Sequence, residues 1–157
     1  MKLVQLVALS TISLAAAAQA AAAGIELRNA WMRPAYAGQP QAMVYVDIRA
    51  NEPLRLVAAK SPAAKEAELV LVDPPGAPPE QHRVVPELPI AANAVTRLPY
   101  LGSHVRLLGV GQDLYAGLSI DLELTFVDAS GKRQVAATTA VVRGVAARRP
   151  DDAAAKP

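Results

Sequence analysis

Few residues in this sequence could carry chemistry, because it contains two histidines and no cysteine. His104 lies in the stretch LGSHVRLLGV at 101–110, two residues before Arg106. Residues two apart in a β-strand project from the same face, so His104 and Arg106 would share one face, opposite Val105 and Leu107. Such a strand can offer an imidazole to a metal ion. It is also typical of an ordinary half-buried strand whose histidine bonds to a neighbour.

His82 is the second candidate metal ligand. It follows DPPGAPPE at 73–80, where four of eight residues are prolines that cannot join a strand ladder. A His82–His104 pair joined by Asp73 or Glu80 would make a site for Cu(II) or Zn(II), which accept imidazole and carboxylate. The other interpretation is that His82 is a polar loop residue without a ligand role.

The remaining polar motifs predict no enzyme. Asp121 and Glu123 alternate with apolar residues, as on the outer face of a β-sheet. Ser61 and Ser103 lack the G-x-S-x-G turn of a nucleophilic serine. Gly109-Val110-Gly111 lacks the third glycine and the following helix of a nucleotide-binding loop, so it is interpreted as a turn.

Composition limits the fold and the partners. A chain of 157 residues has room for one domain with a leader and a tail. Hydrophobic residues make up 52% of the chain and aromatic residues 4%, so we expect an aliphatic core around Trp31 and Phe126. The net charge of +2 includes no basic run among aromatic residues, which argues against nucleic acid as a partner.

The first twenty residues are typical of a secretory signal peptide. Lys2 precedes an apolar stretch that ends in Ala18-Gln19-Ala20, a small-x-small cleavage pattern. We therefore expect a signal peptide over 1–23 with cleavage near 20–23, export to the periplasm, and no stable membrane insertion afterwards. An uncleaved anchor is the alternative. Without cysteine the exported fold has no disulfide, no thiolate ligand and no thiol for a lipid anchor.

Period-two alternation predicts an all-β chain. The expected strands cover 25–33, 42–49, 54–61, 68–72, 81–85, 94–100, 104–110, 118–127 and 134–143. In the second strand, Tyr45 and Asp47 are predicted to face outward, and residues 62–67 to form one helical turn at most. Short strands separated by turn signals favour an antiparallel, Ig-like β-sandwich over 24–145. Residues 146–157 have nothing to bury and are expected to be a disordered tail.

Seven short pieces of the chain follow one another in an order that we recognise. They are NAWMR at 29–33, AGQ at 37–39, SPAA at 61–64, EL at 68–69, LPI at 88–90, GSHVRLLG at 102–109 and LELTF at 122–126. In their order and spacing they resemble the periplasmic PCu(A)C copper chaperones, and the resemblance covers residues 25–143. It implies a cupredoxin-like β-sandwich that binds copper, chiefly Cu(I), and delivers it to the Cu-A centre of a terminal cytochrome oxidase.

The copper motif of that family is largely missing here. The family uses a His, a Met and then a His-x-Met pair, soft and borderline donors that suit Cu(I). The first His falls at Val70, the first Met falls near Gln81 or His82, His104 keeps its position, and Arg106 replaces the last Met. A guanidinium cannot donate to a metal and repels a cation. Met32 and Met43 lie far from this motif in the sequence, so we do not expect them to replace the lost ligands.

The sequence therefore favours an exported copper-chaperone-like protein with a degenerate metal site, divergent within its family. Copper, as Cu(I) or Cu(II), would be bound by His104 and His82 if any metal is bound at all. A cytochrome oxidase subunit or another copper chaperone would be the partner. The alternative is a non-metal periplasmic protein-interaction module on the same fold, in which Arg106 offers a charged contact.

Overall fold

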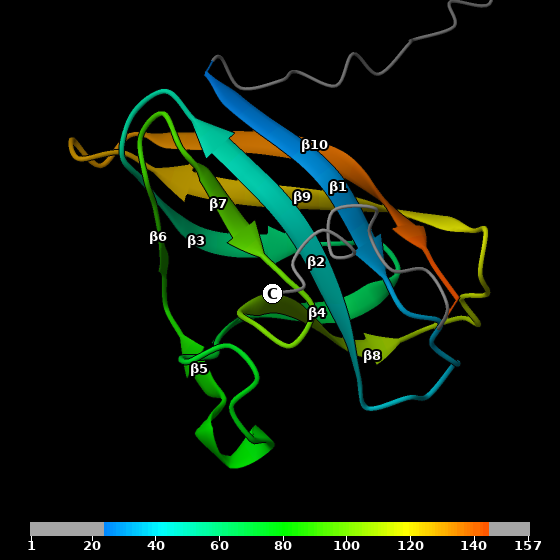
Figure 1. The fold of residues 1–157 in the computed structure, drawn as a ribbon. Coiled ribbons are helices and arrows are strands. Elements are labelled where there is room, and N and C mark those ends of the chain that lie inside the picture. Colours follow the sequence, from blue (N-terminus) through cyan, green and yellow to red (C-terminus); the bar gives the residue numbers. More distant parts are fainter. Residues whose placement is uncertain (1–23, 145–157) are drawn as a thin grey trace, which may run out of the picture.

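The computed structural model describes residues 24–144, and within them ten strands and one short 3-10 helix make up the regular structure (Figure 1). The predicted leader, the end of the expected domain and the predicted tail lie outside the described residues. Within 24–144 no helix has the length and apolar character needed to span a bilayer. The elements are β1 (Ile25–Met32), β2 (Gln41–Ala50), β3 (Leu54–Lys60), β4 (Ala64–Leu71), η1 (Pro79–Gln81), β5 (Arg83–Val85), β6 (Leu88–Ile90), β7 (Val95–Leu98), β8 (His104–Val110), β9 (Ser119–Val127) and β10 (Arg133–Val142).

The strands form one sheet that rolls into a nearly closed sandwich. Their order is β5-β4-β8-β2-β1-β10-β9-β3-β6, with β7 also paired to β2. β3 and β4 contact each other although they share no ladder, which brings the two flanks of the sheet together. The predicted all-β sandwich is confirmed. It is not antiparallel throughout, because β1 and β10 run parallel where Trp31 pairs with Val141.

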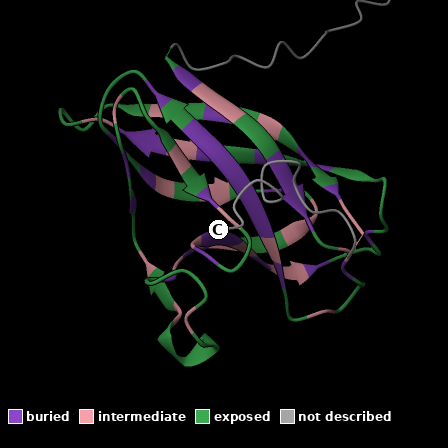
Figure 2. Cartoon of the chain, viewed as in Figure 1, coloured by how far each residue is buried: buried purple, intermediate pink, exposed green. Residues whose placement is uncertain are grey.

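The core is aliphatic, as the composition predicts, and Phe126 lies fully buried within it. Figure 2 shows an almost continuous run of buried residues along β2. Trp31 is buried too, but it is not part of the core cluster. Its ring packs against Tyr45 and Tyr100, with centroids 4.8 and 6.1 Å away. Trp31 is therefore buried as expected, but it lies in an aromatic cluster beside the aliphatic core.

The predicted helical turn at 62–67 was wrong. Residues from Ala64 onward belong to β4, which pairs with β8 from Ala64↔Val110 to Val70↔His104. A ladder partner outside the local sequence supplies these hydrogen bonds, and such tertiary pairing overrides weak local preference. The same ladder places Val70 and Glu68 directly opposite His104 and Arg106.

The outward face predicted for the second strand is in fact covered. Tyr45 is 2% exposed and Asp47 is 7% exposed. β2 is flanked by β1, β8 and β7, and the side-chain amide of Asn29 donates a 2.9 Å hydrogen bond to Asp47. Simple alternation marks which residues share a face, but the neighbouring strands and rings decide whether that face meets water.

Candidate functional site

A pocket of about 530 Å³ opens beside the start of β8. Strands β2 and β8, the segment after β1 and the loop around η1 all contribute to its wall. The polar, charged or sulfur-containing side chains that could bind a ligand here are Arg33, Met43, Tyr45, His82, Tyr100 and His104. It thus brings both histidines of the chain, which are 22 positions apart in the sequence, into one cavity.

His104 is the first residue of β8 and is only 3% exposed. Its Nδ1 lies 2.8 Å from the carbonyl oxygen of Gly102. Because a carbonyl oxygen only accepts hydrogen bonds, Nδ1 carries the proton and Nε2 keeps its lone pair. Proteins usually orient a metal-binding imidazole by such a hydrogen bond from the ring nitrogen that does not bind the metal.

The electrostatic surroundings keep His104 neutral. Burial is the main cause that lowers its pKa below the usual 6.5, and electrostatic interactions with His82 and Arg106 lower it further. The hydrogen bond to Gly102 opposes this shift. A neutral imidazole at pH 7 can bind a metal ion without first losing a proton.

His82 follows η1 and faces the same pocket. Its Nε2 lies 2.9 Å from the carbonyl oxygen of Ala77, so Nε2 is the donor and Nδ1 keeps a free lone pair. The ring centroids of His82 and His104 are 6.0 Å apart. An ion bound to an imidazole lies about 3.2 Å from the ring centroid, given a metal–nitrogen bond of about 2.0 Å. The distance between the two rings is therefore compatible with a single ion bound between them.

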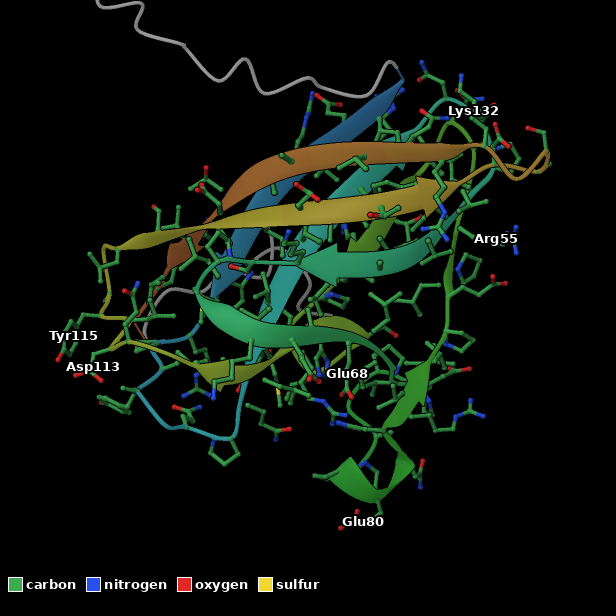
Figure 3. All side chains as sticks on the ribbon, turned by 180° about the vertical axis from the view of Figure 1, so that it is seen from behind. Arg55, Glu68, Glu80, Asp113, Tyr115 and Lys132 are labelled. Atoms are coloured by element: carbon green, nitrogen blue, oxygen red, sulfur yellow. The ribbon has the colours of Figure 1, made fainter. Side chains whose placement is uncertain are left out.

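The family ligand positions at Val70 and Arg106 have a different environment. Val70 is 1% exposed and sits directly opposite His104 in the β4–β8 ladder, where it offers no donor atom. Arg106 pairs across the same ladder with Glu68, with its Nε 2.9 Å from Oε2. Figure 3 labels Glu68 on β4. The guanidinium is thus paired with a carboxylate and does not line the pocket, so it repels a bound cation less than the sequence alone suggests.

The carboxylates proposed to complete a Cu(II) or Zn(II) site do not join the histidines. Asp73 and Glu80 are both exposed, and neither lines the pocket. In Figure 3, Glu80 stands at the outer tip of the η1 loop. Among residues 24–144 no three His, Cys, Asp or Glu side chains are grouped so that they could hold a metal ion. The hypothesis of an imidazole–carboxylate site is not supported.

Met43 is the residue that sequence reasoning missed. It lies on β2 in register with Arg106 and lines the pocket with both histidines. The Tyr45 hydroxyl donates a hydrogen bond to its sulfur at 3.5 Å. Distance along the chain argued against this methionine. The signal that would have found it is the alternation at 42–49, which places Met43 and Tyr45 on one face, combined with a pairing of that strand to 104–110.

Aromatic rings close one side of the pocket. The Tyr45 ring lies 6.1 Å from that of His104 and 5.7 Å from that of Tyr100. Burial is the main cause that raises the pKa of Tyr45 to about 12, with the neighbouring Tyr100 adding to it and Arg33 opposing it. The Tyr45 phenol therefore stays protonated and remains a hydrogen-bond donor. Arg33 in turn donates to the hydroxyl of Tyr100 at 3.1 Å.

Several solved structures have a similar fold. A copper-bound PCuAC domain from PmoF2 is 18% identical, with a TM-score of 0.60, and the match covers 79% of this chain and 96% of that one. The apo form of the PmoF2 domain gives a TM-score of 0.59 at 20% identity, covering 81% and 95%. The solution structure of CuI-DR1885 from Deinococcus radiodurans gives 0.56 at 23% identity, covering 81% and 83%. The sandwich is thus a PCuAC-like fold.

A comparison with curated proteins gives no match. Among protein families, the one described as "Putative lipoprotein LpqE-like" matches residues 25–139, nearly all of the described sandwich. The pocket and both histidines fall inside this match. The chain belongs to the LpqE-like family.

Proposed function

We propose that this protein is an exported copper carrier that binds copper as cargo through His82 and His104. The observation that carries the proposal is the pair of imidazoles 6.0 Å apart in one pocket, each with one nitrogen tied to a backbone carbonyl and the other left with a lone pair. The copper-bound PmoF2 domain and CuI-DR1885, which have a similar fold, support copper as the metal.

The ligand set differs from the motif of the PCu(A)C chaperones. Val70 and Arg106 stand where two family ligands would be, so the binding is expected to rest on donors from the loop and from β8. Copper held by a small number of neutral donors is exchanged more readily than copper in a complete four-ligand site. We infer that such a site suits transfer, with the Cu-A centre of a cytochrome oxidase or another copper chaperone as the acceptor.

Export to the periplasm is part of the proposal. The leader-like sequence at 1–23 and the family description as a lipoprotein support it. The 157 residues contain no cysteine that could take a lipid through its thiol, so we expect a free protein rather than an anchored one. Pulse–chase labelling followed by cell fractionation should show the full-length chain converted to a shorter form in the periplasm.

The alternative of a non-metal interaction module loses its main argument. It required Arg106 as a free charged contact for a partner. Arg106 and Glu68 form an ion pair with side chains 24% and 30% exposed. This pairing occupies the guanidinium, so we do not put the alternative forward as a second function.

Competitive titration of the purified protein with Cu(I), Cu(II) and Zn(II) tests the proposal. A His82→Ala, His104→Ala double variant should lose about 100-fold or more in Cu(I) affinity, since removing even outer-sphere support costs 10–100-fold. Glu80→Ala is the matched control, because Glu80 lies on the same loop outside the pocket. Circular dichroism verifies that each variant is folded. Equal Cu(I) affinity in wild type and the double variant would overturn the proposal.

A further inference from the structure

We propose that Met43 supplies a thioether as the third donor to the copper held by His82 and His104, and that this donor makes the site selective for Cu(I). The inference rests on the proposed copper binding and extends it. It names a ligand from β2 that compensates for the methionine replaced by Arg106.

The register of the sheet places Met43 next to the histidine. Met43 lies directly opposite Arg106 in the antiparallel β2–β8 ladder. Residues directly opposite one another point to the same face, and Arg106 shares its face with His104 two positions earlier. Met43 and His104 are therefore diagonal neighbours on one face, a separation of about 7–8 Å that long side chains bridge. The pocket lining, which includes both side chains, agrees with this placement.

Tyr45 holds the thioether in place. Its hydroxyl donates to the Met43 sulfur at 3.5 Å, while its ring packs at an edge angle against the His104 ring with centroids 6.1 Å apart. Tyr45 is almost fully buried, so both contacts are fixed by the packing of β2. A thioether sulfur has two lone pairs, and one hydrogen bond leaves the other available. Tyr45 is thus a positioning residue for two donors.

The charge of the pocket favours a monovalent ion. None of the three donors carries a negative charge, and the described residues provide no third His, Asp or Glu for a divalent ion. Arg33 lines the same cavity. Its repulsion of a divalent cation is twice that of a monovalent cation at equal distance. Soft thioether and borderline imidazole donors are the set that suits Cu(I), whereas Zn(II) and Cu(II) gain from carboxylates.

Affinity measurements on Met43→Leu test the ligand directly. Leucine keeps the volume and removes the sulfur, a swap that folded cores tolerate. Cu(I) affinity should fall by about tenfold or more, while Zn(II) affinity stays within about twofold of wild type, as expected for a donor that zinc does not use. Met32→Leu is the matched control, because Met32 is fully buried outside the pocket and its replacement should leave both affinities unchanged.

Methyl-labelled NMR gives a second, independent readout. With ¹³C in the methionine ε-methyl groups, Cu(I) or its diamagnetic mimic Ag(I) should shift the Met43 resonance and leave that of Met32 in place, the two being assigned from the leucine variants. If copper binds through His82 and His104 while Met43 neither shifts nor matters for affinity, this inference is overturned and the proposed function stands. If the wild type binds Cu(I) no better than the double histidine variant, both are overturned.

Discussion

His104 and Arg106 stand two residues apart on the same face of β8, yet their surroundings differ completely. His104 faces a pocket, is buried, and has its Nε2 lone pair available. Arg106 turns to Glu68 on β4 and is occupied by an ion pair. The loss of a family ligand at Arg106 is therefore compatible with the copper site proposed around His104. Arg106 is paired with Glu68 on β4, whereas the other candidate donors, Met43 and His82, lie on β2 and after η1.

Among changes to Arg106 and the residues around it, the largest effect is expected from replacing Arg106 with the methionine of the family motif. Arg106→Met removes the cation and adds a thioether on the face of His104, and Cu(I) affinity should rise about tenfold or more, measured by chelator competition. Arg106→Leu is the control, because it removes the same charge without adding sulfur and leaves Glu68 equally unpaired. An equal gain in both variants would mean that charge alone limits binding and that a second thioether adds nothing.

A smaller effect, on stability, tests whether the ion pair matters. Glu68→Ala leaves a half-buried guanidinium without its partner and should lower the free energy of unfolding by about 1 kcal/mol in urea denaturation. Glu26→Ala breaks an exposed pair with Arg28 and should change stability very little. If the two variants are equally stable, Arg106 is not specially accommodated by β4.

The pH dependence of stability tests the environment of His104. The folded pKa is lowered mainly by burial, so as the pH falls below 6.5 the unfolded chain takes up a proton that the folded protein does not. Stability should therefore decrease from pH 7 toward pH 5, by at most about 1.4 kcal/mol per pH unit, and level off below the folded pKa. His104→Gln should lose this slope. A His104→Gln variant with the wild-type slope would contradict a buried, neutral imidazole.

The smallest effect belongs to Tyr45. Tyr45→Phe removes the hydrogen bond to the Met43 sulfur and should cost about 0.5–1 kcal/mol of stability, with a few-fold weaker Cu(I) binding. Tyr100→Phe is the control in the same pocket, because its hydroxyl accepts from Arg33 instead and should not affect the thioether. Weaker copper binding in Tyr100→Phe than in Tyr45→Phe would show that Tyr45 does not position the sulfur.

Much of the fold was predictable because alternation reports strands directly. The strands that became β2, β8 and β9 lie within a residue or two of the predicted ranges. Pairing was not predictable, and the errors follow from it. Residues 62–67 were expected to form one helical turn at most, whereas the residues from Ala64 onward pair with β8. Tyr45 was expected to face outward, whereas Trp31 and Tyr100 pack against it.

The candidate site was predictable only in part, for the same reason. His82 and His104 are rare residues, so composition alone singled them out, and the structure brings them together. Met43 is separated from His104 by 61 positions in the sequence, and only the β2–β8 register makes them neighbours. Asp73 and Glu80, which are close to His82 in sequence, lie outside the pocket. Proximity along the chain was the misleading criterion in both cases.

The position of His82 has a kinetic consequence. His104 and Met43 belong to strands, whereas His82 follows a proline-rich loop. Its Nε2 forms a hydrogen bond with the carbonyl oxygen of Ala77 within that loop. In the proposed site, a copper ion shared between the sheet and one loop would lose the loop ligand first, while the sheet retained the other donors. An incoming ligand from an acceptor protein would then take the place of His82. Release would proceed by stepwise ligand exchange, at a rate set by loop opening rather than by unfolding of the sandwich.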